Sequence, residues 1–256
     1  MKIPIIYEDP HVLVCEKPVG MLVQSDRSMD VDMVNELKNY LYEKQTEKKE
    51  PYLGLIHRLD RPVGGVLVFA KTPVAAKSLS SQAGGEQGGK NSLPKMEKRY
   101  YAVIDKDLSN KLGNEAEELV NYLVKDARTN TSKITGANDK NGKKAILSYK
   151  VLAVSTDEKG YPISLVEVTL KTGRHHQIRV QMAGNQMPLW GDTKYNDDFT
   201  KRQRENPDMR WANIGLYSHS LVFTHPISKK RMGFNSEPKE GIFKQFLTGK
   251  LLSSKE

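Results

Sequence analysis

The sequence has almost no cysteine and no long apolar run. Cys15 is the single cysteine among 256 residues, which excludes an internal disulfide and a cysteine-based zinc cluster. It follows the apolar run Val12–Val14, so we expect it to be a buried strand residue. No apolar stretch approaches the length needed to cross a bilayer, and an acid at Glu8 comes too early for a signal peptide. These absences predict a cytoplasmic globular protein with no membrane partner.

Acidic residues are also fewer than basic ones. The chain has 40 Lys and Arg against 31 Asp and Glu, a formal net charge of +9, and its pI is about 9.3. An excess of this size suits a polyanionic partner, and a solvated basic surface is the alternative. Because 38% of the residues are hydrophobic, the chain is not disordered and can bury one large core or two small ones.

Two apolar runs flank a polar insert. Leu53–Ile56 and Val66–Ala70 predict two buried strands, and Pro62–Gly65 between them has turn chemistry, since proline presets φ and glycine accepts positive φ. If the insert is extended, Arg58 and Asp60 share one side of it. A carboxylate at this place is either a structural ion-pair partner or a reacting group. Composition alone favours the structural role, because paired charges are common and catalytic ones are rare.

The sequence of this region, HRLDRPVGGVLVFAK, resembles the central motif of the RluA-type family of RNA pseudouridine synthases. In that family the Asp of H-R-L-D is catalytic, and it corresponds to Asp60. Five further segments resemble the family's other motifs in the same order: Ile5–Gly20, Glu97–Val103, Thr172–Val180, Pro188–Tyr195 and Leu216–Pro226. Together the motifs cover about residues 3–226, so the resemblance extends over most of the chain.

The resemblance implies an α+β fold, the pseudouridine synthase fold. Such a fold has a long bent antiparallel or mixed sheet with flanking helices and a central active cleft. We expect one catalytic domain over residues 1–256, in which residues 227–256 form a C-terminal strand, a helix and a tail. The family's S4 RNA-binding domain is expected to be absent, because the catalytic pattern begins at Ile3. We expect the protein to act as a monomer.

The implied activity is isomerisation of uridine to pseudouridine at specific sites in structured RNA, either ribosomal or transfer RNA. The reaction breaks the N1–C1′ bond, turns the base and rejoins it through C5. It changes no oxidation state, so we expect no cofactor and no metal. It needs one ionised carboxylate, which attacks C1′, adds to C6 of uracil, or removes a proton from C2′. The sequence leaves these three routes open.

The resemblance assigns three residues to catalysis. Asp60 is the nucleophile or base. Burial raises the pKa of an Asp, and a nearby guanidinium opposes this, a role that falls to Arg179. Tyr100 is the family's active-site tyrosine, whose ring stacks on the uracil. The alternatives are a helix-surface arginine at Arg179 and an ordinary strand aromatic at Tyr100.

Four further residues are expected to contact the substrate. Arg58 fills the place that the target base leaves when it turns out of the stack. Ile178 and Leu216 match apolar pocket walls, although both are also compatible with plain core positions. His57 is either an RNA contact or a buried, hydrogen-bonded histidine.

Two departures from the family pattern bear on target choice and loop rigidity. The family commonly has T-S-G after H-R-L-D-R, and this chain has Pro62–Gly65 (PVGG) there. The Thr of G-R-T-H-Q-I-R is His175. His175 and His176 are adjacent and would face different ways from a regular element, so we do not expect a metal pair.

The rest of the chain gives coarser expectations. Lys17 lies in a turn and is either a solvated lysine or a contact to an RNA phosphate. Segment 82–92 is predicted to be a glycine-rich surface loop, 125–144 a basic variable hairpin and 199–210 a basic loop. Apolar periodicity predicts helices over 30–42, 74–81 and 175–183, and apolar runs predict strands over 100–104, 145–154, 163–170 and 216–223.

Two other functions are compatible with parts of this pattern. A non-catalytic RNA-binding protein that retains the fold is the main alternative, but it has no need of a carboxylate in its pocket. A glycosidase-like hydrolase generally uses a second carboxylate opposite the first, and no such acid occurs in these motifs.

Overall fold

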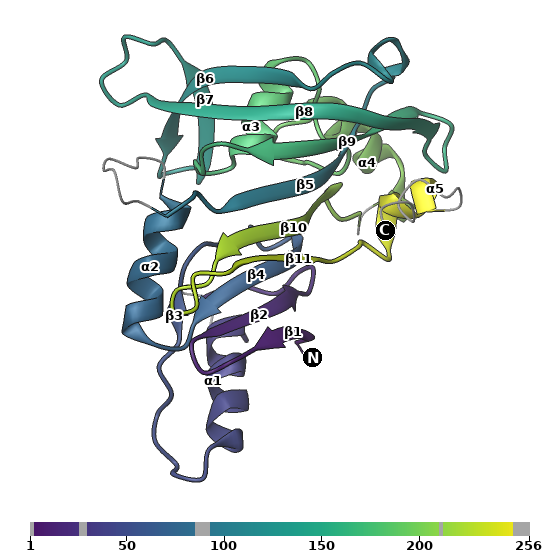
Figure 1. Cartoon of the computed structure of the whole chain (residues 1–256). Coiled ribbons are helices and arrows are strands. Elements are labelled where there is room, and N and C mark those ends of the chain that lie inside the picture. Colours follow the sequence, from purple (N-terminus) through teal and green to yellow (C-terminus); the bar gives the residue numbers. More distant parts are fainter. Residues whose placement is uncertain (1–2, 26–29, 85–92, 210–211, 248–256) are drawn as a thin grey trace. The chain divides into compact units, whose positions relative to one another are not determined.

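The computed structural model describes residues 3–25, 30–84, 93–209 and 212–247. Its contacts divide the chain into two compact units (Figure 1). Unit 1 consists of Met1–Lys98 and Ser218–Ser236, and unit 2 consists of Arg99–Tyr217 and Glu237–Glu256. Two strands, β5 (Glu97–Ile104) and β10 (Leu216–Thr224), run from one unit into the other.

Unit 1 is built on a sheet that contains several antiparallel strand pairs. Its strands, besides β10, are β1 (Ile5–Glu8), β2 (Val12–Lys17), β3 (Gly54–Leu55), β4 (Gly64–Ala70) and β11 (Arg231–Asn235). They lie in the order β1-β2-β4-β10, with β3 beside β4 and β11 beside β10. Strand β4 is buried along its whole length, as its apolar sequence predicts. Cys15 is buried in β2, as expected, and burial raises the pKa of its thiol.

Both helices of unit 1 begin at a side-chain cap. Asp32 accepts a hydrogen bond from the backbone N–H of Asn35 and starts α1 (Met33–Lys44). Thr72 does the same for α2 (Pro73–Ala83), where Pro73 occupies the first turn. Ala75 and Leu79 of α2 pack with Val66 and Val68 of β4 in one hydrophobic cluster. Lys17 ends β2 and Asp60 precedes β4, so both lie next to strands that pack in this cluster.

Unit 2 is built on longer strands. Besides β5, they are β6 (Glu117–Asp126), β7 (Thr131–Thr135), β8 (Lys143–Thr156) and β9 (Pro162–Leu170), in the order β5-β9-β8-β6-β7. The pairings β6–β7, β6–β8 and β8–β9 are antiparallel. Buried residues alternate with exposed ones along β8, as expected for a strand with one face on the core.

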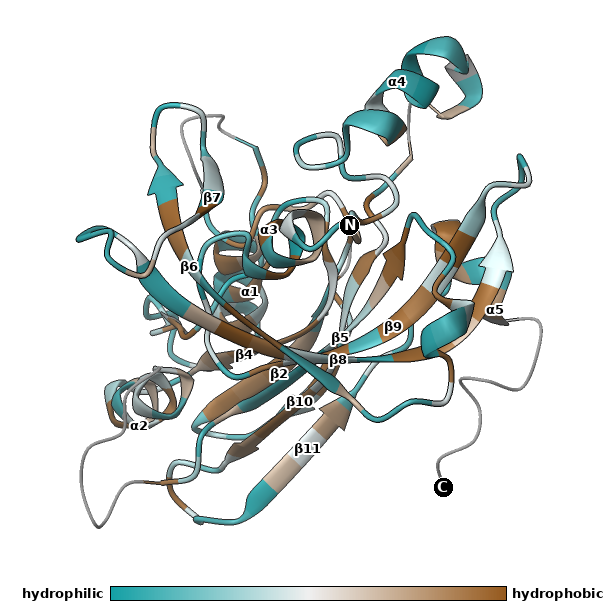
Figure 2. Ribbon diagram, turned by 90° about the horizontal axis from the view of Figure 1, so that it is seen from above, coloured by the Kyte–Doolittle hydropathy of each residue, from teal (hydrophilic) through white to brown (hydrophobic). Residues whose placement is uncertain are grey.

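The helical segments of unit 2 are short. They are η1 (Ser109–Lys111), α3 (Gln177–Gly184), α4 (Asp197–Glu205), η2 (Pro207–Met209), η3 (Gly241–Phe243) and α5 (Lys244–Leu247). Helix α3 packs on β6 and β7, so its Val180 contacts Leu123 and Ala145 in the core. Helix α4 is almost wholly hydrophilic (Figure 2) and buries only Phe199.

The predicted α+β class and most predicted elements are confirmed. Three predictions were wrong in detail. Residues 199–205 belong to α4 and not to a loop, because Asn196 caps a helix there. Gln82 and Ala83 belong to α2, whereas residues 85–92 of the predicted loop lie outside the described part of the chain. The segment 175–183 becomes helical only from Gln177.

No helix in the described ranges is long and apolar enough to cross a bilayer. The single catalytic domain over residues 1–256 and its central cleft stay predictions.

Candidate active site

Asp60 lies between β3 and β4 of unit 1, next to a turn at residues 61–62. The residue is half-buried, and its backbone carbonyl accepts a hydrogen bond from the N–H of Val63 at 2.9 Å. The neighbouring Leu59 is buried and fixes the segment to the core, whereas Arg58 is exposed. This places a carboxylate and a guanidinium close together in sequence at the surface of unit 1.

Lys17 is hydrogen-bonded to the backbone of the segment that follows Asp60. Its side chain is 1% exposed, and its ammonium donates three hydrogen bonds, to the carbonyls of Pro18 (2.9 Å), Arg61 (2.9 Å) and Val63 (2.8 Å). Both sequence alternatives, a solvated lysine and a phosphate contact, were therefore wrong. The physical reason is that the Asp60 loop folds over the end of β2 and leaves carbonyls that only a buried donor can satisfy.

The charge of Lys17 is coupled to that of Asp60. Burial lowers the pKa of Lys17 to about 7, the Asp60 carboxylate opposes this shift, and the Arg61 guanidinium adds to it. An ammonium and the predicted catalytic carboxylate therefore interact within unit 1, independently of Arg179.

A second set of contacts joins the same two loops. The N–H of Gly20 donates to the carbonyl of Arg61 at 2.9 Å, and Nε of Arg61 donates back to the carbonyl of Gly20 at 3.1 Å. Arg61 also forms an ion pair with Asp30 at 2.9 Å. The K-P-V-G turn and the H-R-L-D-R segment thus form one hydrogen-bonded body.

His57 is half-buried, but both of its ring nitrogens are shielded from solvent, and neither has a hydrogen-bond partner among the described residues. Burial lowers the pKa of His57 to about 3, and the nearby Lys98 ammonium adds to this shift. The imidazole is therefore neutral at neutral pH. Of the two sequence alternatives, the hydrogen-bonded core histidine was wrong, and the RNA contact stays a prediction.

Tyr100 lies on β5 and is buried, 6% exposed. Its neighbour Tyr101 packs in a hydrophobic cluster with Val103 and Ile163. Because side chains alternate along a strand, Tyr100 faces the other way.

Arg179 lies on α3 and is 6% exposed, so the alternative of a helix-surface arginine was wrong. Its Nε donates to Oδ2 of Asp192 at 2.8 Å, and its Nη2 donates to Oδ1 at 2.7 Å. Asp192 is 1% exposed. The ring of Tyr195 lies 5.2 Å from the guanidinium carbon of Arg179, at cation–π distance. Within unit 2, Asp192 therefore binds one edge of the guanidinium and the Tyr195 ring lies against one face.

His175 and His176 stack on each other, with ring centroids 3.8 Å apart. The expectation that they diverge was wrong, because His176 has φ +52° and the backbone there is not a regular element. Nδ1 of His176 lies 2.7 Å from the Tyr195 hydroxyl, and Nδ1 of His175 lies 2.9 Å from Oγ of Ser132. In the described ranges, no group of three or more His, Cys, Asp or Glu side chains is placed to hold a metal ion.

The predicted residues fall into two sets. Unit 1 holds His57, Arg58 and Asp60 on one short segment. Unit 2 holds the other four, of which Ile178 is 4% and Leu216 is 6% exposed: Tyr100, Ile178, Arg179 and Leu216. Burial alone does not separate pocket walls from plain core, so those two assignments stay predictions.

Sequence reasoning missed the roles of Lys17, Asp192 and Tyr195. Each lies in a segment that matches a family motif, so the positions were in view. Their hydrogen-bond partners lie far away in the sequence or depend on a turn. No local pattern identifies such partners.

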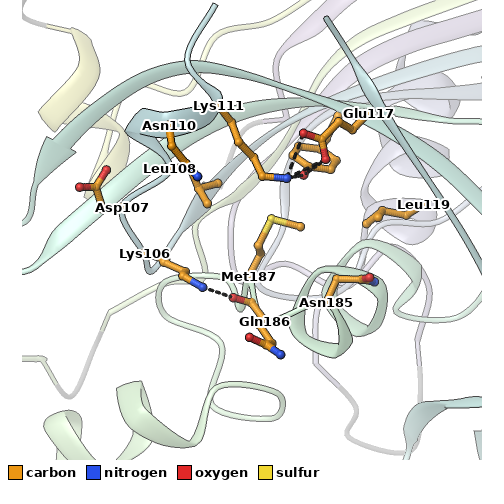
Figure 3. A pocket seen from close by; sticks show the side chains of 11 residues that line it. Lys106, Asp107, Leu108, Asn110, Lys111, Glu117, Leu119, Asn185, Gln186 and Met187 are labelled. Atoms are coloured by element: carbon orange, nitrogen blue, oxygen red, sulfur yellow. Dashed lines mark hydrogen bonds and ion pairs between the residues drawn. The ribbon is translucent and has the colours of Figure 1, made fainter. Parts of the chain in front are cut away.

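Unit 2 also has a pocket that contains none of the predicted residues (Figure 3). It has a volume of about 290 Å³ and lies between the η1 segment, β6, Tyr149 of β8 and the residues that follow α3. The ammonium of Lys111 donates to both carboxylate oxygens of Glu117, at 2.9 and 2.7 Å, so its charge is already compensated.

Comparison with known proteins identifies a family model and relatives that are all RNA pseudouridine synthases. Residues 11–184 match the family model described as RNA pseudouridylate synthase. The ribosomal large subunit pseudouridine synthase D of Zymomonas mobilis is 29% identical over 237 residues, which cover 91% of this chain and 68% of that protein. The tRNA pseudouridine synthase C of Vibrio parahaemolyticus is 28% identical over 241 residues, 91% of this chain and 89% of that protein.

Solved structures show the same fold. The human RNA pseudouridylate synthase domain containing 1 superposes with a TM-score of 0.67 at 19% identity, over 93% of this chain and 84% of that one. The human RNA pseudouridylate synthase domain containing 4 gives a TM-score of 0.66 at 20% identity, over 92% and 88%.

Proposed function

The chain belongs to the RNA pseudouridylate synthase family, and from this premise we propose that it converts specific uridines of structured RNA to pseudouridine with Asp60 as the catalytic carboxylate. The relatives are named for the ribosomal large subunit and for tRNA, so the proposed substrates are ribosomal or transfer RNA. The observation that carries the assignment is the position of Asp60 on a segment that Lys17 ties to β2 through two backbone carbonyls.

The reaction sets the requirements for the site. The N1–C1′ bond breaks, a C5–C1′ bond forms, C5 loses its proton and N1 gains one. Asp60 acts as nucleophile or base and must be ionised when uridine enters. In this proposal Lys17 contributes positive charge from the same unit, Arg179 supplies the guanidinium partner, and Tyr100 stacks on the uracil.

Two other functions make different demands. A non-catalytic RNA-binding protein would gain nothing from a half-buried carboxylate on a tethered loop. A hydrolase would release free uracil and leave an abasic site, whereas an isomerase keeps the base attached. Product analysis therefore separates hydrolysis from isomerisation directly.

Asp60→Asn tests the proposal, because the amide keeps the size of the side chain and removes its charge. We expect the variant to form no pseudouridine, measured as tritium released from [5-³H]uridine in ribosomal and transfer RNA transcripts. RNA affinity should stay within about three-fold, since Asp60 contributes chemistry and not phosphate contacts. Asp198→Asn, at an exposed carboxylate of α4, is the control and should release tritium like the wild type. Turnover by Asp60→Asn near the wild-type rate would refute the assignment.

A further inference from the structure

The P-L-W-G-D-T-K-Y segment matches a family motif, but none of its residues has a role in the function proposed so far. Its Asp192 and Tyr195 both contact Arg179. Asp192 accepts two parallel hydrogen bonds from the guanidinium, a bidentate geometry that fixes the plane of the group. The N–H of Lys194 donates to the same carboxylate at 3.0 Å and holds it in place. The acid is therefore itself anchored by the backbone of the loop.

The Tyr195 ring lies against one face of the guanidinium. Its hydroxyl accepts a hydrogen bond from the backbone N–H of Ser132 at 2.8 Å and lies 2.7 Å from Nδ1 of His176. The hydroxyl thus has two partners on different segments, the backbone of β7 and the His176 imidazole. Together these two contacts hold the Tyr195 ring in position.

Ser132 belongs to β7, the last strand in the order β5-β9-β8-β6-β7. The N–H groups on the outer side of an edge strand have no strand partner. Tyr195 satisfies one of them, so its hydroxyl joins the loop after α3 to the edge of the β6–β7 hairpin. This hairpin has exposed cations at Lys125, Arg128 and Lys133, while its Asp126 accepts hydrogen bonds from turn N–H groups.

We infer that Asp192 and Tyr195 are positioning residues for Arg179, and that Tyr195 makes the orientation of Arg179 depend on contact between the β6–β7 hairpin and the RNA backbone. The inference rests on the proposed role of Arg179. An RNA phosphate that draws Arg128 or Lys133 shifts β7, and the hydrogen bond from Ser132 passes this shift to the Tyr195 ring over the guanidinium. The Arg179 guanidinium then reaches its catalytic orientation only after RNA has bound to the hairpin.

Unit 2 contains a matched control for these contacts. Arg202 forms an ion pair with Asp105, and its guanidinium lies 4.4 Å from the ring of Tyr161. The residue types and the burial of the acid match those at Arg179, but neither Asp105 nor Tyr161 lies in a family motif.

The first experiment compares Asp192→Asn with Asp105→Asn, each of which breaks a buried ion pair. Single-turnover rates and RNA dissociation constants are measured below the melting temperature of the less stable variant. We expect Asp192→Asn to react about 100-fold more slowly with RNA affinity nearly unchanged, because a small misplacement of a catalytic group has that effect. Asp105→Asn should stay within about three-fold of wild type, since Asp105 contacts Arg202 and Asn196 and makes no recorded contact with Arg179. Equal losses in the two variants would reduce Asp192 to a structural role.

The second experiment needs no turnover and so stands even if the proposed function fails. The ¹⁵Nε–¹Hε signal of Arg179, assigned with Arg179→Lys, is followed by NMR during titration with an RNA stem-loop. In the wild type we expect the chemical shift of this signal to change when RNA is added. The change should be smaller when Arg128 and Lys133 are both replaced by Gln. In Tyr195→Phe the signal should start at a different chemical shift and should not respond to RNA. Tyr161→Phe should leave it unaffected. A wild-type signal that ignores RNA, or one that responds equally in Tyr195→Phe, would overturn the link to the hairpin.

Discussion

Lys17 is the residue whose position departs most from what its sequence suggests. Turn lysines are normally solvated, because removing an ammonium from water is costly. Here the cost is offset by three carbonyl acceptors and by the negative charge of Asp60. The same ammonium thus fixes the backbone of the proposed catalytic loop and contributes to its potential.

Replacing Lys17 with Met keeps its length and removes its charge and its three donors. We expect single-turnover pseudouridine formation to slow by about ten-fold or more, because residues 61–63 lose their tether and Asp60 loses a fixed position. RNA affinity provides the check and should stay within about three-fold of wild type. An equal loss of affinity and rate would mean that the variant has lost its fold and not only the position of Asp60.

The pH dependence of stability tests the state of Lys17. Its pKa is about 7 in the folded chain and 10.5 ordinarily, so between these values the unfolded chain binds more protons. The cost of protonating Lys17 in the folded chain is therefore absent above pH 10.5 and grows as the pH falls to 7. Urea unfolding should therefore give wild type about 2 kcal/mol more stability at pH 9 than at pH 7. In Lys17→Met the part of that difference due to Lys17 should be lost, while the part due to Lys98, whose pKa is also lowered by burial, should remain. An unchanged difference would mean that Lys17 does not contribute to it.

Arg58 separates base flipping from chemistry. If the exposed Arg58 fills the gap left by the extruded uridine, Arg58→Ala should slow modification of a stem-loop much more than that of an unstructured oligonucleotide. The reason is that unstacking costs about a few kcal/mol in a helix and little in a flexible strand. Arg58→Lys should rescue poorly, since an ammonium has no planar face to stack on bases. Single-turnover kinetics on two RNAs of matched local sequence give the answer, and equal rate ratios would leave Arg58 as a charge partner only.

Among the secondary-structure elements, β4 passes very close to β10 at a glycine. Gly65 has φ +117°, and a Cβ atom there would lie 2.1 Å from the carbonyl oxygen of Ser218 in β10. Gly65 pairs with Lys17 across β2 and β4, so it lies at the root of the Asp60 loop. Replacement of the family's T-S-G by P-V-G-G is therefore compatible with a rigid turn.

Gly65→Ala should destabilise unit 1 by about 4 kcal/mol or more, because it combines a backbone clash with a strained φ. Gly20→Ala in the same unit is the matched control. Gly20 has φ +85°, and none of the described atoms lies within 4 Å of the place that an alanine methyl would take. Only about 1 kcal/mol of strain is therefore expected there. Urea unfolding of both variants measures the difference, and similar losses would show that the approach of Ser218 is unimportant.

For the whole molecule, the net charge of +9 predicts salt-sensitive RNA binding. Each neutralised phosphate releases counterions, so four contacts weaken binding about a hundred-fold between 50 and 200 mM salt. Changing Arg128 and Lys133 of the hairpin to Gln should lower the salt slope by about two, whereas the same change at Lys48 and Lys49 removes equal charge and should leave it unaltered. A dissociation constant that does not vary with salt would mean that the basic excess is ordinary surface.

The sequence by itself determined the fold class, most of the elements and the family. Continuous apolar runs predicted the buried strands β2 and β4, apolar periodicity predicted α1 and α2, and the motif series selected Asp60, Tyr100 and Arg179 as candidates. These features are local, because periodicity, capping and turn chemistry act within a few residues. Helix α4 is the exception, because its hydrophilic sequence has no apolar periodicity that would predict a helix. It begins at the Asn196 cap and packs on the core through Phe199.

Only the tertiary structure showed which groups the buried polar side chains bind. Lys17 finds carbonyls more than 40 residues away, and Tyr195 finds the backbone of Ser132 63 residues away. The Arg179–Asp192 pair likewise depends on the turn of the chain after α3. Buried polar groups must be satisfied wherever the fold places them, and the identity of the satisfying group follows from three-dimensional proximity, which no local pattern encodes.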